Sequence, residues 1–104
     1  MSIQHPEITS ADLAEIRGRL EAEAQARSQL LAEGDADGEL EEGLRLTAEQ
    51  FVADLRDAIE RIDDGRYGFC EACGGAIAAA RLEAVPTAAQ CVSCVDRPLR
   101  PLGR

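Results

Sequence analysis

The sequence predicts a mainly α-helical protein, in which an antiparallel two-helix coiled-coil hairpin is followed by a small four-cysteine zinc finger. Two long proline-free stretches rich in helix-forming residues flank a turn-forming run, which is the pattern of a helical hairpin. All four cysteines fall in two C-x2-C pairs beyond the second stretch. With 104 residues, the chain has room for one domain but not for a large apolar core.

The chain begins with a polar segment, residues 1–9, which we expect to be a flexible N-terminus. Its His5 is the only histidine of the chain, and its polar surroundings indicate an exposed residue rather than a metal ligand. Thr9 or Ser10 can cap the helix that follows, because both side chains accept a hydrogen bond from a free backbone N–H. Asp12 lies near the positive end of that helix dipole.

The first helix is expected over about residues 10–33, and with the second helix it forms a hairpin over residues 10–64. Apolar residues recur along one side, although the stripe is weak where Glu23 and Arg27 fall. The stripe consists of Leu13, Ile16, Leu20, Ala24 and Leu31.

An acidic turn is expected at the tip of the hairpin, at residues 33–42. The run GDADG at 34–38 combines residues that stop helices and favour turns, and the whole stretch has six acidic residues and no basic one. The second helix begins either near Glu39 or at the capping-box pattern Thr47-Ala-Glu-Gln50. Its apolar residues follow a heptad seam: Leu44, Ala48, Phe51, Leu55, Ala58 and Ile62.

The cysteine spacing C-x2-C-x17-C-x2-C predicts one structural zinc ion within a finger at residues 65–96. Each C-x2-C turn directs two thiolates at one ion, and four thiolates leave no open coordination position. Two disulfides would need an oxidising compartment, yet the N-terminus lacks the pattern of a secretion signal. A thioredoxin-like redox site would need strands that the sequence does not supply. The expected ligands are Cys70, Cys73, Cys91 and Cys94.

The net charge of −9 is unevenly distributed along the chain. Residues 1–69 hold 17 acidic and 7 basic side chains, whereas residues 70–104 hold 3 acidic and 4 basic ones. The acidic part repels phosphate backbones, so direct sequence-specific DNA binding is not expected and a basic protein surface is the better partner. The prolines and arginines of residues 97–104 indicate a short, extended basic tail. The sequence shows no membrane span. It also contains no recognisable set of catalytic residues, so an enzyme is not expected.

The run GRYGFCEACGGAIAAARLEAVPTAAQCVSC, residues 65–94, resembles the zinc-finger signature of the DksA/TraR family of bacterial transcription factors. The cysteine spacing and the residues between the cysteines agree together. The matching positions are Gly65, Tyr67, Gly68, Gly74, Ile77, Arg81, Leu82, Ala84, Pro86 and Ala88.

This resemblance implies a cytoplasmic regulator that binds RNA polymerase without binding DNA. Members of the family place a coiled-coil arm in the secondary channel of the polymerase, where acidic residues at the tip alter initiation complexes. The family's tip pattern D-x-x-D-x-A is absent here, so Asp35, Asp37 and Glu39 are the candidate effector residues by charge and place in the turn. The acidic second helix also argues against dependence on the nucleotide ppGpp.

Other uses of the same features remain open at this stage. Arg81 could contact a partner or could brace the finger through hydrogen bonds to backbone carbonyls. The heptad seam would serve the core of a monomer or a weak coiled-coil dimer. The hairpin and finger could form an adaptor for a protein other than polymerase, and four cysteines in one small module could form a thiol- or zinc-responsive sensor.

Overall fold

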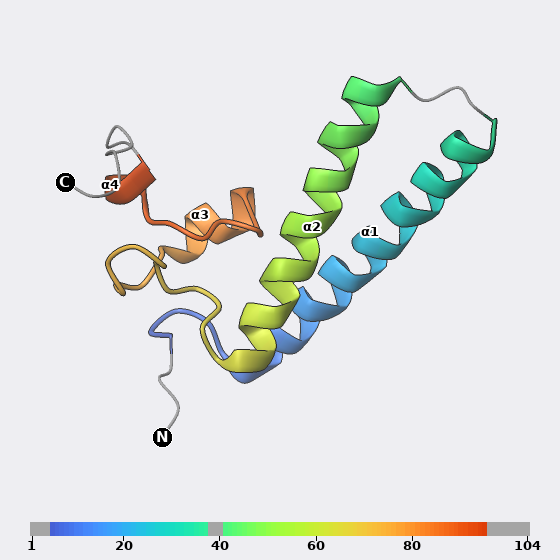
Figure 1. Cartoon of the computed structure of the whole chain (residues 1–104). Coiled ribbons are helices and arrows are strands. Elements are labelled where there is room, and N and C mark those ends of the chain that lie inside the picture. The colour runs from blue at the N-terminus through green and yellow to red at the C-terminus, as the bar shows by residue number, and fades with distance from the viewer. Residues whose placement is uncertain (1–4, 38–40, 96–104) are drawn as a thin grey trace.

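The computed structural model describes residues 5–37 and 41–95, and describes side chains for 5–34 and 41–95. Two long helices, α1 (Ser10–Asp37) and α2 (Glu42–Asp64), pack against each other as a hairpin that we call the arm. The finger carries two short helices, α3 (Ala79–Ala84) and α4 (Val92–Val95). Figure 1 shows the finger beside the base of the arm, while the linked ends of α1 and α2 project away from it. The predicted fold class is confirmed.

The start of α1 is fixed by a reciprocal capping arrangement. The backbone N–H of Asp12 donates to Thr9 Oγ1 at 3.1 Å, and the N–H of Thr9 donates to Asp12 Oδ2 at 3.0 Å. Two N–H groups that would otherwise lack a helical partner are therefore satisfied. Of the two caps that the sequence offered, Thr9 is the one used.

The end of α1 lies beyond the position expected from the sequence. The helix continues through Gly34 and Asp35 to Asp37, whereas the prediction stopped it at Glu33. One glycine within a helix costs only about 1 kcal/mol relative to alanine, so the sequence around Gly34 weakens the helix without ending it. Because α2 begins at Glu42, the link between the helices is shorter than the predicted acidic turn of residues 33–42.

Helix α2 begins before the capping-box pattern and ends at a glycine. Thr47 lies inside the helix, where its hydroxyl donates to the carbonyl of Gly43 at 3.1 Å. Of the two starts that the sequence left open, the later one at this pattern is therefore wrong, and the helix begins at Glu42, close to the earlier one at Glu39. At the other end, Gly65 has a φ of 79°, and its N–H donates to the carbonyl of Ile62 at 3.1 Å. A left-handed residue after the last turn is the usual role of glycine at a helix C-terminus.

The arm core is best packed in the half near the finger. Leu20 and Ala24 of α1 and Leu55 and Ala58 of α2 are buried there, as both predicted stripes require. At the weak point of the α1 stripe, the guanidinium of Arg27 lies 4.3 Å from the centre of the Phe51 ring. A cation over an aromatic face continues the contact where an apolar residue is absent.

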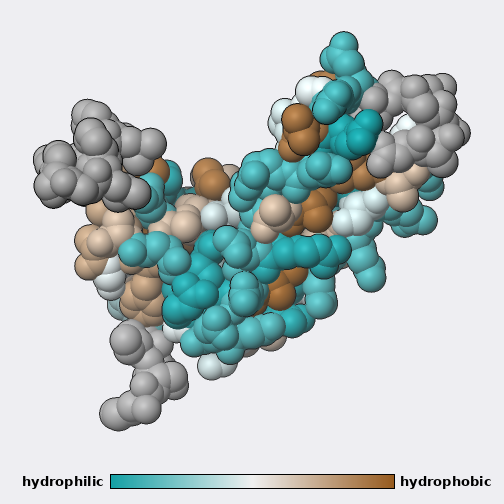
Figure 2. Space-filling model, viewed as in Figure 1, coloured by the Kyte–Doolittle hydropathy of each residue, from teal (hydrophilic) through white to brown (hydrophobic). Residues whose placement is uncertain are grey.

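The half of the arm far from the finger is less well covered. Leu44 of the predicted seam is 60% exposed, and Leu30 and Leu46 are exposed to a similar degree. Figure 2 shows hydrophilic residues over much of the visible arm, with hydrophobic residues among them. The two stripes therefore meet only over part of their length.

No described helix is both long enough and apolar enough to span a membrane.

Candidate metal centre

The first C-x2-C pair lies on a tight turn that is closed by backbone hydrogen bonds. The N–H of Cys70 donates to the carbonyl of Gly75 at 2.7 Å, and the N–H of Gly74 donates back to the carbonyl of Cys70 at 2.8 Å. The N–H groups of Ala72 and Cys73 approach the Cys70 sulfur at 3.4 Å. Donors of this kind stabilise a thiolate, which is the form that binds metal.

The second pair begins just before α4, and this helix brings its thiols to the first pair. The N–H of Cys94 donates to the carbonyl of Cys91 at 3.1 Å, which closes the turn between the two. The four sulfur atoms lie within 4.8 Å of one another.

The spacing of the sulfur atoms fits a metal and not a disulfide. The Cys73 and Cys91 sulfurs are 3.8 Å apart, whereas a disulfide bond measures about 2.05 Å. With Zn–S bonds of about 2.3 Å, a tetrahedral site has S···S edges of about 3.8 Å. The geometry therefore suits one four-coordinate ion with soft ligands.

The local environments of Cys70 and Cys94 shift their thiol pKa values in opposite directions. Burial alone would raise the pKa of Cys70, but N–H donors from Cys91, Cys73 and Ala72 outweigh it and lower the pKa to about 6. Hydrogen bonding to the Cys70 and Cys91 sulfurs raises the pKa of Cys94 to about 12. Four thiols this close cannot all ionise without a cation among them.

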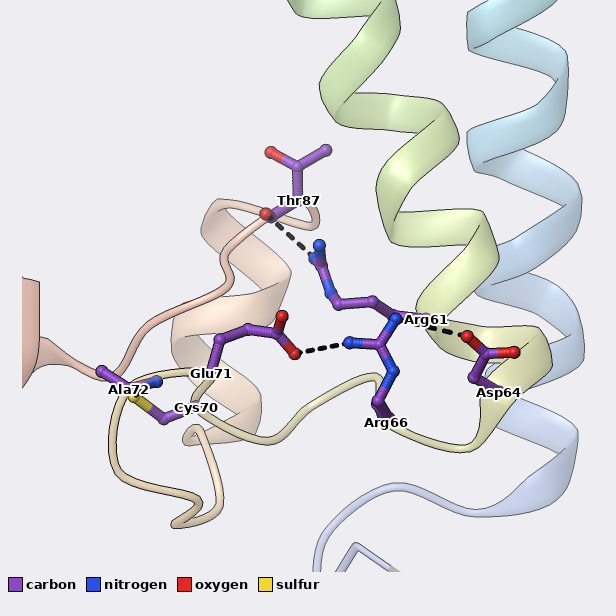
Figure 3. A network of polar contacts seen from close by, with 7 residues as sticks. All are labelled: Arg61, Asp64, Arg66, Cys70, Glu71, Ala72 and Thr87. Carbon is purple, nitrogen blue, oxygen red and sulfur yellow. Dashed lines mark hydrogen bonds and ion pairs between the residues drawn. The ribbon is translucent and has the colours of Figure 1, made fainter.

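A buried arginine joins the finger to the end of α2. Arg61 is only 5% exposed, and its Nη2 donates to the carbonyl of Thr87 at 3.3 Å (Figure 3). Its own carbonyl accepts the N–H groups of Arg66 and Tyr67. Tyr67 is buried beside it and donates its hydroxyl to the carbonyl of Pro86 at 2.6 Å. Burial raises the pKa of Tyr67, so the phenol remains a neutral donor.

A second arginine links the same regions at the surface. Arg66 donates to Glu71 Oε2 at 2.8 Å and to Asp64 Oδ2 at 3.3 Å, and it lies between these carboxylates in Figure 3. The last residue of α2 is thereby connected to the first zinc turn. Arg61 and Arg66 were not predicted for this junction, although an arginine beside an otherwise apolar seam is a signal that could have identified Arg61.

The N-terminal segment packs on the finger, and residues 5–9 make contacts there that were not predicted from the sequence, while the flexibility of residues 1–9 stays a prediction. His5 Nε2 and the carbonyl of Ile77 are 2.7 Å apart, and the N–H of Glu7 donates to His5 Nδ1 at 3.0 Å. This arrangement requires the tautomer with the proton on Nε2. The His5 ring also lies 5.5 Å from that of Phe69, centre to centre. We call residues 5–9 the strap.

The strap also contacts the start of α3, and its position accounts for the glycine at residue 68 of the finger. Glu7 Oε1 accepts the backbone N–H of Ala79, the first residue of α3, at 2.8 Å. Gly68 has a φ of 89°, and a Cβ there would lie 2.7 Å from the Cδ2 atom of His5. Both the backbone conformation and the close approach of the ring therefore require glycine at this position.

The other predicted site residues separate into two groups. Arg81 donates from Nε to the carbonyl of Gln90 at 2.9 Å, directly before Cys91, so it braces the finger. Whether it also contacts a partner stays a prediction. Asp35 and Asp37 lie in the last turns of α1, with side chains outside the described set. Glu39 and the predicted basic tail, residues 97–104, lie outside the described residues.

Comparison with known protein families identifies the finger. Residues 65–97 match the prokaryotic dksA/traR C4-type zinc finger. This match agrees with the four clustered sulfur atoms, and the chain therefore carries a C4-type zinc finger whose cysteines are positioned to bind one metal ion.

The similar proteins extend this likeness beyond the finger. An RNA polymerase-binding transcription factor DksA from Caulobacter vibrioides is 38% identical over 66 residues, which cover 64% of this chain and 46% of that protein. The DksA protein of Escherichia coli K12 is 36% identical over 45 residues, 43% of this chain and 30% of that one. The aligned regions thus span less than half of the curated relatives.

Two solved structures share the fold over most of the chain. The RNA polymerase binding protein and transcriptional regulator Dks from Chlamydia trachomatis superposes with a TM-score of 0.66 at 24% identity, covering 86% of this chain and 88% of that one. DksA2 from Pseudomonas aeruginosa gives a TM-score of 0.53 at 25% identity, covering 82% and 75% of the two chains. The chain therefore carries a finger of the prokaryotic dksA/traR C4 type, and its helical arm and finger together have the fold of these two solved structures.

Proposed function

We propose that this protein is a transcription regulator that binds RNA polymerase directly and inserts the arm into the secondary channel to modulate initiation. The observation that carries the proposal is the combination of a dksA/traR-type finger with a projecting helical arm. The similar proteins from Caulobacter and Chlamydia are named for binding RNA polymerase. Action at polymerase also implies a cytoplasmic location.

The arm has two properties that suit this role. It projects from the finger as a pair of helices packed along one another, so its end can enter an opening while its base stays outside (Figure 1). The stretch from Glu33 to Glu42 has six acidic residues and no basic one, which favours approach to a positively charged channel. The finger, braced by zinc and by the Arg61 contact, would set the angle at which the arm enters.

The first experiment measures binding of the zinc-loaded protein to RNA polymerase from the same bacterium. A known secondary-channel factor serves as competitor. We expect binding that the competitor displaces, because two arms cannot occupy one channel. Binding without displacement would place the contact elsewhere on polymerase. Absence of binding at micromolar concentrations, with capture of another stable partner, would favour the adaptor alternative.

A second experiment tests the proposed effector residues at the end of the arm. Asp35→Asn with Asp37→Asn removes two charges there and should abolish the effect on initiation while polymerase binding persists. Asp57→Asn with Glu60→Gln removes the same charge from exposed positions of α2 and is the matched control. In vitro transcription is the measurement, and equal activity of the two double variants would remove Asp35 and Asp37 from the mechanism.

A further inference from the structure

A groove lies between α1 and α3, bordered at one end by the strap. Its volume is about 970 Å³. The apolar part of its lining comes from all three elements and from the segment after α3. The larger of these apolar residues are Ile8, Ile16, Leu20, Leu82 and Pro86. Leu20 and Leu82 are almost fully buried, so the apolar surface that the groove offers where the arm meets the finger comes mainly from Ile8, Ile16 and Pro86.

The same groove has a strongly acidic border. Five exposed carboxylates line it, against the single positive charge of Arg19: Glu7, Asp12, Glu15, Glu23 and Glu83. Three of these already accept hydrogen bonds, namely Glu7 from Ala79, Asp12 from Thr9 and Glu23 from Arg27. The excess of negative charge repels anions and favours a basic segment that also carries apolar side chains.

The chain itself contains such a segment directly after α4. Residues 97–102 repeat the tripeptide Arg-Pro-Leu, and Arg104 follows. In a polyproline II helix, which has three residues per turn, this repeat places Leu99 and Leu102 on one edge and Arg97 and Arg100 on another. The two edges match the apolar lining and the acidic border of the groove.

Length and tethering favour this segment over a separate partner. Nine residues follow Val95, the end of α4, and they span about 28 Å at 3.1 Å per residue. Since α3 and α4 belong to the same finger, the segment starts from the module that forms one wall of the groove. A tethered segment has an effective concentration on the order of millimolar, so weak complementarity is enough for occupancy.

We propose that the groove is a docking site for the chain's own residues 96–104. Leu99 and Leu102 contact the apolar lining, and Arg97 and Arg100 pair with carboxylates of the border. The docked segment bridges arm and finger and covers the junction against other basic segments. This inference goes beyond the proposed function, because it needs no polymerase.

The test uses a zinc-loaded variant that ends at Val95, together with the labelled synthetic peptide DRPLRPLGR. Fluorescence anisotropy should show that the peptide binds the shortened protein at least tenfold more tightly than the full chain, in which the tethered segment competes. Glu15→Arg with Glu83→Arg in the shortened protein should weaken peptide binding at least tenfold. Asp57→Arg with Glu60→Arg on α2 is the matched control and should leave it within twofold, after correction for salt.

A measurement on the full chain completes the test. Leu99→Ser with Leu102→Ser should shift the NMR resonances of Leu20 and Leu82, whereas those of Leu46 at the far end of the arm should not move. Equal peptide binding by the two charge-reversed variants, or unchanged Leu20 and Leu82 resonances, would overturn the proposal. Self-association of the full chain that disappears on removal of residues 96–104 would also overturn it, because the segment would then dock on a second copy.

Discussion

The arm and the finger are stabilised by different interactions. In the arm, the half near the finger depends on apolar side chains such as Leu20 and Leu55, each at most 2% exposed. In the finger, Ile77 and Leu82 join the same buried core, but the rest of the chain is held by backbone hydrogen bonds, by the Arg61 and Tyr67 contacts and by four clustered thiols. Burial of apolar surface needs no ion, whereas the thiol cluster does. The two regions should therefore fail under different conditions.

Removal of the metal should have the largest effect, and it should fall on the finger. Cys91→Ser, or chelation of zinc, removes metal-linked folding energy on the order of 10 kcal/mol. The amide resonances of residues 65–95 should then lose their dispersion, while circular dichroism retains most of the helical signal of α1 and α2. Metal-free protein with a dispersed finger spectrum would show that the arm and finger are not stabilised differently.

Truncation of the arm core should have the next largest effect. Leu55 is 1% exposed, and Leu55→Ala should lower the free energy of unfolding by about 2 to 5 kcal/mol. Leu46→Ala is the control, since this side chain is 59% exposed and its truncation should cost less than about 0.5 kcal/mol. Urea denaturation of the zinc-loaded proteins gives both values. Equal costs would mean that the two halves of the arm are packed alike.

The contact between strap and finger should be worth less than either. Gly68→Ala forces a side chain onto a left-handed residue and against His5, and should cost about 1 to 3 kcal/mol. In a His5→Ala background the close approach is absent and only the backbone strain remains, so the same change should cost less. A double-mutant cycle by urea denaturation measures the difference. Additive effects would mean that the strap does not press on Gly68.

Local sequence patterns predicted part of the arm and the finger, whereas contacts between distant residues could not be predicted. The stripes that bury Leu20 and Leu55 and the spacing of the cysteines are local patterns, and they predicted the hairpin and the thiol cluster. The His5 contact joins residues 72 positions apart, and nothing near His5 in the sequence indicates Ile77. Arg61 was not predicted for a similar reason, since its burial depends on the carbonyl of Thr87, which lies 26 positions further along the chain.

Helix α1 continues through Gly34 because the helix propagates more easily than the turn-forming residues oppose it. Turn-forming residues lower helix propensity by only about 1 kcal/mol each, and a long preceding helix propagates through them at little cost. The acidic end of the arm is therefore still acidic, but part of it is helical. The sequence therefore predicted the charge at this end of the arm correctly, but it predicted a turn where the backbone is helical.

The smallest effect should come from the surface pair between Arg17 of α1 and Asp63 of α2. Arg17 donates to both Asp63 carboxylate oxygens, at 2.8 and 3.0 Å, and this hydrogen bonding lowers the pKa of Asp63 below its ordinary 3.8. Both side chains are substantially exposed, so Asp63→Asn should cost little, and less at high salt. Urea denaturation at low and high ionic strength, with Glu60→Gln as the charge-matched control, measures it.

The pH at which this pair is lost should differ from the pH at which the finger unfolds. Because Asp63 has a lowered pKa, its contribution is complete at neutral pH and disappears only as the pH falls through that lowered value. Zinc leaves earlier, since its thiolate ligands take up protons in weakly acidic solution. In an NMR titration from pH 7 downward, the finger resonances should therefore collapse while Asp63 is still ionised. Protonation of Asp63 before zinc release would place the acid-sensitive point in the arm instead.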